Sequence, residues 1–192
     1  CINKLNEEYN EIMESINTKI VNNIENIDSF FHAMNNFRVN SKLKFNEKFY
    51  DIVVYIFNKA QDILLNQRNN EIEDLLIILP QTYFKEINGK KIYLLEGIKS
   101  HIIYKKMEFW KSLIVKSIEN DMKLIRKMNS SNTISKEKKE DIVNNKFITF
   151  LKLMKELDVS IEKILDLFGQ IMDKYKFSET SKNQVLSSIN NY

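Results

Sequence analysis

The sequence predicts an all-α fold, an irregular bundle of about six to eight helices that begins with a long amphipathic helix. Two observations support this prediction. The 192 residues include only 3 Gly and 1 Pro, whereas β-rich and α/β folds use more Gly in tight turns. Apolar residues also recur every three or four positions along most of the chain, which is the spacing of one helix face.

An apolar stripe runs through the first part of the chain and predicts one long helix over residues 2–36. Its steps average about 3.5 residues, so a coiled-coil seam is an alternative to packing on the same domain, which we favour. The stripe widens near Phe30 and Phe31, as expected of a helix that faces a core. Its members are Ile2, Leu5, Tyr9, Ile12, Ile16, Ile20, Ile24, Ile27, Phe31 and Met34.

The next helical pattern covers residues 46–66 and follows a polar, Asn-rich connection at 35–44. Asn46 is a suitable N-cap because its side chain can accept a backbone N–H of the first turn. A short polar break then precedes a very apolar helix at 71–79, and Pro80 ends that helix.

Residues 91–128 contain the only Trp and carry apolar side chains on more than one helix face. They predict a large helix that is covered by neighbours and bent near Gly97. The Asn88-Gly89 pair just before this helix is a turn signal. Within residues 82–95 it either closes a β-hairpin or joins two helices, and we favour the second arrangement.

The polar segment 129–139 predicts a linker. It would divide an N-terminal helical subdomain, residues 1–128, from a C-terminal helical subdomain, residues 140–192, that packs on the first.

Three helical patterns follow this linker, at residues 141–157, 161–175 and 179–189. Ser160 and Ser178 stand directly before the second and third patterns and are predicted N-caps. The connections are short, which favours antiparallel packing of neighbouring helices.

Charge and cysteine content exclude several functional classes. The net charge of +3, from 29 basic and 26 acidic residues, does not indicate a nucleic-acid surface over the whole molecule. No apolar run reaches the roughly 18 residues that span a membrane, and a cytoplasmic location is expected. The single cysteine, Cys1, excludes an internal disulfide and a multi-cysteine metal site. It is either the boundary of an excised piece, which we favour, or the lipid-bearing residue of a surface lipoprotein.

No catalytic or cofactor motif is recognisable, because the chain lacks Gly-x-x-x-x-Gly-Lys, Gly-x-Gly and Gly-x-Ser-x-Gly. His32 and His101 lie far apart in the sequence and are predicted to be partly buried structural residues. The acidic residues are interspersed with Lys and Asn and are expected to be solvated. Abundant Asn, Lys and Ile are typical of AT-rich coding sequence. We therefore expect a non-enzymatic protein without a cofactor or a metal.

Basic residues flank the aromatic pair Phe109-Trp110, as they do in calmodulin targets and in helices that lie on membranes. The interpretation that we favour is core packing of Trp110, with lysine stems covering its edge.

A second basic cluster brackets the predicted linker and could contact acidic lipid or phosphate. Glu137, Glu140 and Asp141 dilute its charge, so we favour a solvated loop. The cluster consists of Arg126, Lys127, Lys136, Lys138 and Lys139.

The expected function is binding of another protein through an apolar groove or stripe between helices. The chain contains 12 Phe, 8 Tyr and 7 Met, which suit adaptable helix-in-groove contacts. In another version of this hypothesis, the N-terminal stripe pairs with a second copy of the chain. Nucleic acid is not an expected partner, and membrane contact would be peripheral. The candidate partner-binding residues are Ile16, Ile20, Ile24, Phe109 and Trp110.

One resemblance to a known family concerns the second half of the chain. The run FWKSL at 109–113, the charged linker after it, and the two apolar helices within 150–177 resemble helical segments near the C-terminus of DENN-type Rab exchange factors. This resemblance implies a helical regulatory segment of a membrane-trafficking protein, which is an alternative to the general interaction module.

Overall fold

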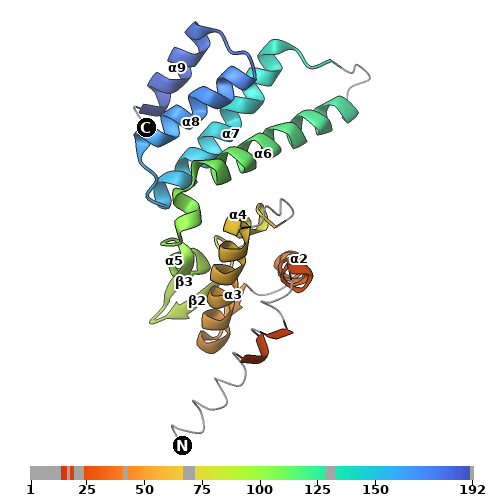
Figure 1. Cartoon of the computed structure of the whole chain (residues 1–192), viewed down its shortest axis with the longest axis vertical. Coiled ribbons are helices and arrows are strands. Elements are labelled where there is room, and N and C mark those ends of the chain that lie inside the picture. The colour runs from red at the N-terminus through yellow and green to blue at the C-terminus, as the bar shows by residue number, and fades with distance from the viewer. Residues whose placement is uncertain are drawn as a thin grey trace, which may run out of the picture. The chain divides into compact units, whose positions relative to one another are not determined.

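A computed structural model describes residues 14–16, 18–19, 24–40, 43–66, 72–128 and 133–190. Within these ranges the fold is mostly helical, which confirms the predicted all-α class, and it also includes one small three-stranded sheet. The chain divides into two compact units, Cys1–Ile103 and Tyr104–Tyr192 (Figure 1). Each unit buries aromatic residues of its own.

Helix α3 (Glu47–Asn66) carries a continuous buried face in the first unit. It begins where the sequence predicted, because the Asn46 side-chain oxygen accepts the backbone N–H of Phe49 at 2.9 Å. Buried residues recur along it at steps of three and four, so one side of the helix faces the core. They are Tyr50, Val53, Ile56, Phe57, Ala60, Gln61 and Leu64.

Helix α2 (Ile24–Asn40) contains the described end of the predicted N-terminal helix. Its residues Phe31 and Met34 are buried, and the Phe31 ring meets the Phe57 ring of α3 at 4.6 Å between centroids. The helix extends to Asn40, so the first part of the expected connection at 35–44 is helical. Residues 14–16 are also helical, whereas most of the remaining prediction lies outside the described residues.

The predicted apolar helix before Pro80 is shorter than expected and forms α4 (Leu75–Ile78), which packs on α2. The turn Asn88-Gly89 closes a hairpin of β2 (Phe84–Ile87) and β3 (Lys90–Tyr93), so the favoured inter-helix turn was wrong. Both turn residues have positive φ, 52° and 76°, which Asn and Gly tolerate and which matches the twist of paired strands.

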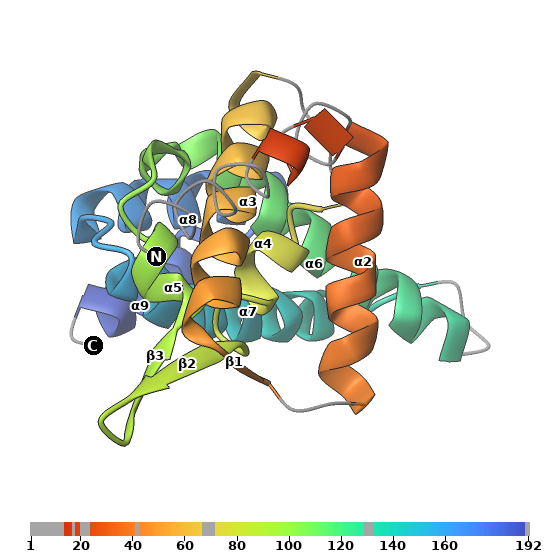
Figure 2. The same cartoon turned by 90° about the horizontal axis from the view of Figure 1, so that it is seen from below.

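A third strand, β1 (Lys44–Phe45), pairs in parallel with β2 (Figure 2). The residues after the hairpin do not continue into one large helix, contrary to the prediction for 91–128. They form β3, then α5 (Leu94–Ile98), then a 3₁₀ turn at Ile102–Lys105, and only then the long helix.

Tertiary contacts hold the first part of this segment, at the end of β3 and in α5, within the first unit. The backbone N–H of Leu94 donates to the Tyr83 carbonyl at 2.9 Å, and that of Leu95 donates to the Pro80 carbonyl at 3.1 Å. Helix α5 also packs closely on α3, because a Cβ added at Gly97 would lie 2.7 Å from a methyl carbon of Val54. The absence of a side chain at Gly97 therefore permits this approach.

In the part of the second unit that the structure describes, four long helices lie side by side (Figure 1). Helices α6, α7 and α8 pack on one another, and α9 packs on α7 and α8. Trp110 and the stacked rings of Phe147 and Phe168, 4.0 Å apart, are fully or almost fully buried among them. The helices are α6 (Met107–Met128), α7 (Lys136–Glu156), α8 (Ile161–Lys174) and α9 (Glu179–Asn190).

The serines that precede these helices differ in their role. The Ser178 hydroxyl accepts the backbone N–H of Ser181 at 3.1 Å, as predicted for an N-cap. Ser160 occupies the N-cap position of α8, but its side chain makes no capping hydrogen bond. Ser135 caps α7 by accepting the Lys138 N–H at 3.2 Å, so α7 begins inside the expected linker.

The two units divide between Ile103 and Tyr104, whereas the sequence-based division was placed at 129–139. That polar segment lies within the second unit, between α6 and α7, which pack against each other. In the part of the chain that the structure describes, no helix is both long and apolar enough to cross a membrane.

Candidate functional site

An apolar pocket of about 310 Å³ opens in the first unit. Helix α2 provides one wall, and the short strand β1, the first turn of α3 and the residue before β2 provide the rest. The volume is at the lower end of the range for small-ligand pockets and also suits one or two large apolar side chains. The lining consists of Phe30, Ala33, Met34, Phe37, Phe45, Phe49 and Tyr83, which we call the aromatic pocket.

The local sequence explains how α2 forms its wall. Ile27, Phe31 and Met34 are buried against the unit. Phe30 and Phe37 are seven residues apart and therefore line a second, adjacent face of the same helix. This is the face that widens the apolar stripe in the sequence.

Tyr83 positions the opposite wall. Its ring stacks on that of Phe45 at 4.7 Å between centroids and 8° between planes, and Phe45 meets Phe49 edge-on at 4.9 Å. The Tyr83 hydroxyl donates a hydrogen bond to the Met34 carbonyl at 2.6 Å, which links α2 to the sheet. Pocket geometry is therefore held by contacts among α2, β1 and the residue before β2.

Two of the lining rings are unusually exposed. Phe37 is 61% exposed and Phe49 is 45% exposed, whereas Tyr83 is only 2% exposed. Exposed large rings beside a formed hollow are a common feature of binding surfaces. The pocket thus combines a buried base with two accessible aromatic edges.

The electrostatics of the pocket are close to neutral. Burial raises the pKa of the Tyr83 phenol, and the nearby Arg38 guanidinium opposes this, so the phenol is protonated at neutral pH. Around the adjoining sheet, Lys44 pairs with Glu86 at 2.9 Å and Lys85 pairs with Asp51 at 3.2 Å. The one hydroxyl in the lining is already bonded to a carbonyl, so the pocket is suited to apolar binding rather than to proton transfer.

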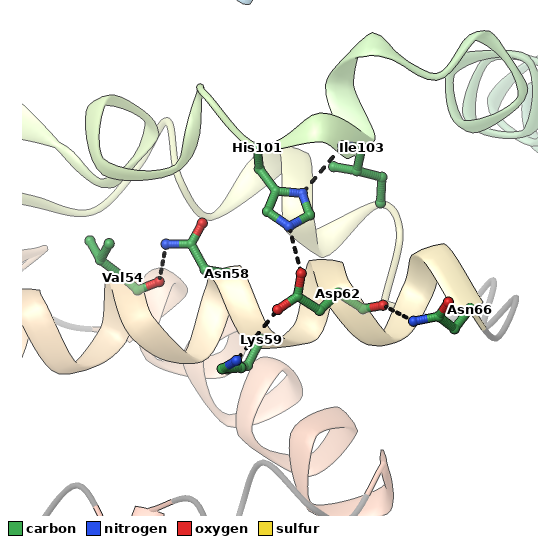
Figure 3. A network of polar contacts seen from close by, with 7 residues as sticks. All are labelled: Val54, Asn58, Lys59, Asp62, Asn66, His101 and Ile103. Atoms are coloured by element: carbon green, nitrogen blue, oxygen red, sulfur yellow. Dashed lines mark hydrogen bonds and ion pairs between the residues drawn. The ribbon is translucent and has the colours of Figure 1, made fainter.

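A separate polar network surrounds His101, at the end of the first unit (Figure 3). Its Nδ1 accepts the backbone N–H of Ile103 at 3.2 Å, so the proton of the neutral ring is on Nε2, which donates to Asp62 of α3 at 3.1 Å. Asp62 also lies 3.6 Å from the Lys59 ammonium. Both ring nitrogens are occupied, and the side chain is 11% exposed, as expected of a partly buried structural histidine.

His32 was also predicted to be a partly buried structural residue, and this prediction is wrong. Its side chain is 54% exposed and lies 3.5 Å from Asp28. It follows the buried Phe31 directly, and one step along a helix turns a side chain about 100° away from the core face. Among the described residues, no group of three or more His, Cys, Asp or Glu side chains is arranged to hold a metal ion.

The candidate residues from the N-terminal stripe are only partly described. Ile16 lies in a short helical stretch and is half-buried. Ile20 and the side chain of Ile24 fall outside the described residues, although the Ile24 backbone begins α2. The structure therefore places only one of these three side chains.

The other two candidates lie in the core of the second unit. Trp110 is fully buried, and its indole N–H donates to the Tyr104 carbonyl at 2.9 Å. Phe109 is 7% exposed and meets the Trp110 ring edge-on at 5.4 Å. The favoured interpretation of Trp110 as a core residue is confirmed, and neither ring is available at the surface.

The pocket residues were not among the sequence candidates. Phe37 and Phe45 lie in or beside the stretch that was interpreted as a connection, so their aromatic character carried little weight. The available signal was the widening of the stripe at Phe30.

Comparisons with protein-family models, curated proteins and solved structures find no match to this chain.

Proposed function

We propose that this chain is a non-catalytic protein-interaction module and that the aromatic pocket receives apolar side chains of a partner helix. One observation carries the proposal: Phe37 and Phe49 expose large ring surfaces beside a preformed apolar hollow. Burying such rings against a partner would remove apolar area from water, which is the main driving force of association.

The lining favours a helical partner. On α2 it presents residues at the i, i+3, i+4 and i+7 positions, which form one straight wall along the helix. An amphipathic helix that lies along such a wall places its own residues at the same spacing into the groove. The methionine in the lining can adapt to side chains of different shapes.

The experiment is selection of amphipathic helical peptides from a displayed library against the whole chain, followed by measurement of Kd by fluorescence anisotropy. Replacing Phe37 and Phe49 together with Asn should weaken the selected peptides by at least about tenfold, because central aromatic contacts dominate interface energies. Ala33→Trp should have a similar effect by filling the pocket. Both variants change exposed positions, so helix content by circular dichroism should be unchanged.

Ile87→Asn is the matched control, because Ile87 is an exposed apolar residue of the same unit outside the pocket. It should bind the peptides as the wild type does. Selected peptides that bind the two pocket variants with unchanged Kd would contradict the proposal, as would a selection that returns no binder.

Pairing with a second copy through the N-terminal stripe of Ile16, Ile20 and Ile24 stays a prediction. So does the regulatory role in membrane trafficking that the resemblance implies, and so does a cytoplasmic location.

A further inference from the structure

The last turns of α6 and the first turn of α7, the helix ends on either side of residues 129–132, carry several basic side chains (Figure 1 shows the two helices). Other lysines of this unit form ion pairs, such as Lys146 with Asp121 at 2.8 Å and Lys174 with Glu119 at 2.9 Å. Within the described ranges, no carboxylate pairs with the five cations at this end. They are Lys123, Arg126, Lys127, Lys138 and Lys139.

Two large apolar side chains are exposed among these cations. Leu124 is 60% exposed and Met128 is 79% exposed. They are four residues apart on α6 and therefore form one row along the last helical turns. Lys123 and Lys127 form the neighbouring row at the same spacing. We call these two apolar residues and the five cations the basic helix-end surface.

Acidic residues near this surface only partly offset its charge. Glu140 is 3.8 Å from Lys136, and Glu137 and Asp141 are exposed on α7. The second unit as a whole has 17 basic and 12 acidic residues, a net charge of +5, whereas the first unit has 12 and 14, a net charge of −2. The positive charge of the chain is therefore concentrated in the unit that carries this surface.

We propose that the basic helix-end surface binds anionic lipid bilayers peripherally. Leu124 and Met128 enter the boundary between headgroups and acyl chains, while Lys123 and Lys127 in the neighbouring row contact the anionic headgroups. The other three cations add electrostatic attraction to the anionic surface. An exposed apolar row next to a basic row is the arrangement that this mode of binding requires. The site lies in the second unit and does not depend on the aromatic pocket.

The exposed apolar side chains favour lipid over nucleic acid. Proteins that bind single strands without sequence preference combine cations with aromatic rings on which bases stack. The exposed apolar side chains here are Leu and Met, which cannot stack in that way but can insert between lipids.

The test is co-sedimentation of the whole chain with vesicles of phosphatidylcholine alone and of phosphatidylcholine with about 30% phosphatidylserine. We expect binding to the anionic vesicles only, weakened as salt rises from about 0.1 M to about 0.5 M. Replacing Arg126, Lys127 and Lys138 with Glu should lower the partition constant by at least about tenfold. Replacing Leu124 with Asn and Met128 with Gln should also lower it, although the net charge does not change.

The matched charge control replaces three exposed lysines, Lys152, Lys155 and Lys163, with Glu. Lys152 is about 20 Å along α7 from Lys138 by the helical rise, so this triple variant changes the net charge equally at a different place. It should retain most of the vesicle binding. The double Asn variant of Phe37 and Phe49 should retain it fully, which separates this proposal from that for the pocket.

Four outcomes would overturn the proposal: equal binding to both vesicle types, equal loss in the two triple Glu variants, undiminished binding of the Leu124 and Met128 variant, or binding of an RNA oligonucleotide without binding to vesicles. Circular dichroism of each variant checks that the helices are intact.

Discussion

The two units of this chain differ in the elements that pack against their helices and in the side chains that stay exposed. The first unit packs α2, α5 and a three-stranded sheet against α3 and leaves aromatic rings exposed around a pocket. Among its described residues, the second unit packs four long helices on one another and buries most of its aromatic residues, including Trp110. Its strongly exposed large apolar side chains are aliphatic instead, namely Leu124, Met128 and Ile148.

This difference shows that aromatic content alone does not locate a binding surface. Phe109 and Trp110 are the most conspicuous aromatic pair in the sequence, yet mutual helix packing buries both. Phe37 and Phe49 stand in less conspicuous surroundings, yet they are 61% and 45% exposed. The strongly exposed aromatic rings thus lie in the first unit, whereas the second unit buries most of its described rings.

The largest expected effect is on the stability of the second unit, and it tests the contribution of the buried Trp110 ring. Trp110→Ala should lower the free energy of unfolding by about 3–5 kcal/mol, because it leaves a cavity and removes the hydrogen bond to Tyr104. Hydrogen exchange should show loss of protection in α6, α7 and α8. Equal loss of protection in α3 and α5 would mean that the two units unfold together, which would contradict their description as separate units. Phe49→Ala, a ring removed at an exposed position, is the control.

A smaller effect concerns the close contact of α3 and α5 in the first unit. Gly97→Ala should destabilise by roughly 1 kcal/mol, because overpacking against the stiff Val54 side chain outweighs the better helix propensity of Ala. In a double-mutant cycle measured by urea unfolding, Val54→Ala should relieve part of this cost and give a favourable coupling of about 1 kcal/mol. If the two changes in unfolding free energy simply add, the side chains at positions 97 and 54 do not clash, and the prediction is wrong.

The smallest effect is a pH dependence in the second unit. Burial, and then the Glu119 carboxylate, raise the pKa of Tyr175 to about 12, and the buried hydroxyl has no hydrogen-bond partner among the described residues. Because the folded pKa exceeds the usual value of about 10, this contribution to stability is complete below about pH 10 and is lost as pH rises toward 12.

Tyr175→Phe should therefore leave the melting temperature at pH 7 unchanged or slightly raised, and it should make the alkaline decline between about pH 10 and 12 shallower. Tyr50 and Tyr83 of the first unit also have raised pKa values because of burial, and they should keep their alkaline sensitivity in this variant. A decline identical to that of the wild type would contradict the assignment to Tyr175.

Parts of the fold that depend on near neighbours in the sequence were predictable. The cap at Asn46, the cap at Ser178 and the helices that follow them are confirmed, because capping and helical periodicity involve residues within about four positions of each other. The hairpin at Asn88-Gly89 had a local signal too, but the apolar run after it also fitted a helix. The pairing of β2 with β1, about 40 residues earlier in the chain, is not visible in such local patterns.

The sequence by itself determined the helical class of this protein and the starts of several helices, through backbone hydrogen bonds that close within a single turn. Only the tertiary structure decided that Phe37 and Phe49 are exposed, that the units divide at Ile103, and that Tyr83 completes a pocket with α2. The physical reason is that burial is a property of segments that meet in space. Exposure of a ring depends on which distant helix or strand lies over it, and spacing along the chain does not encode that directly.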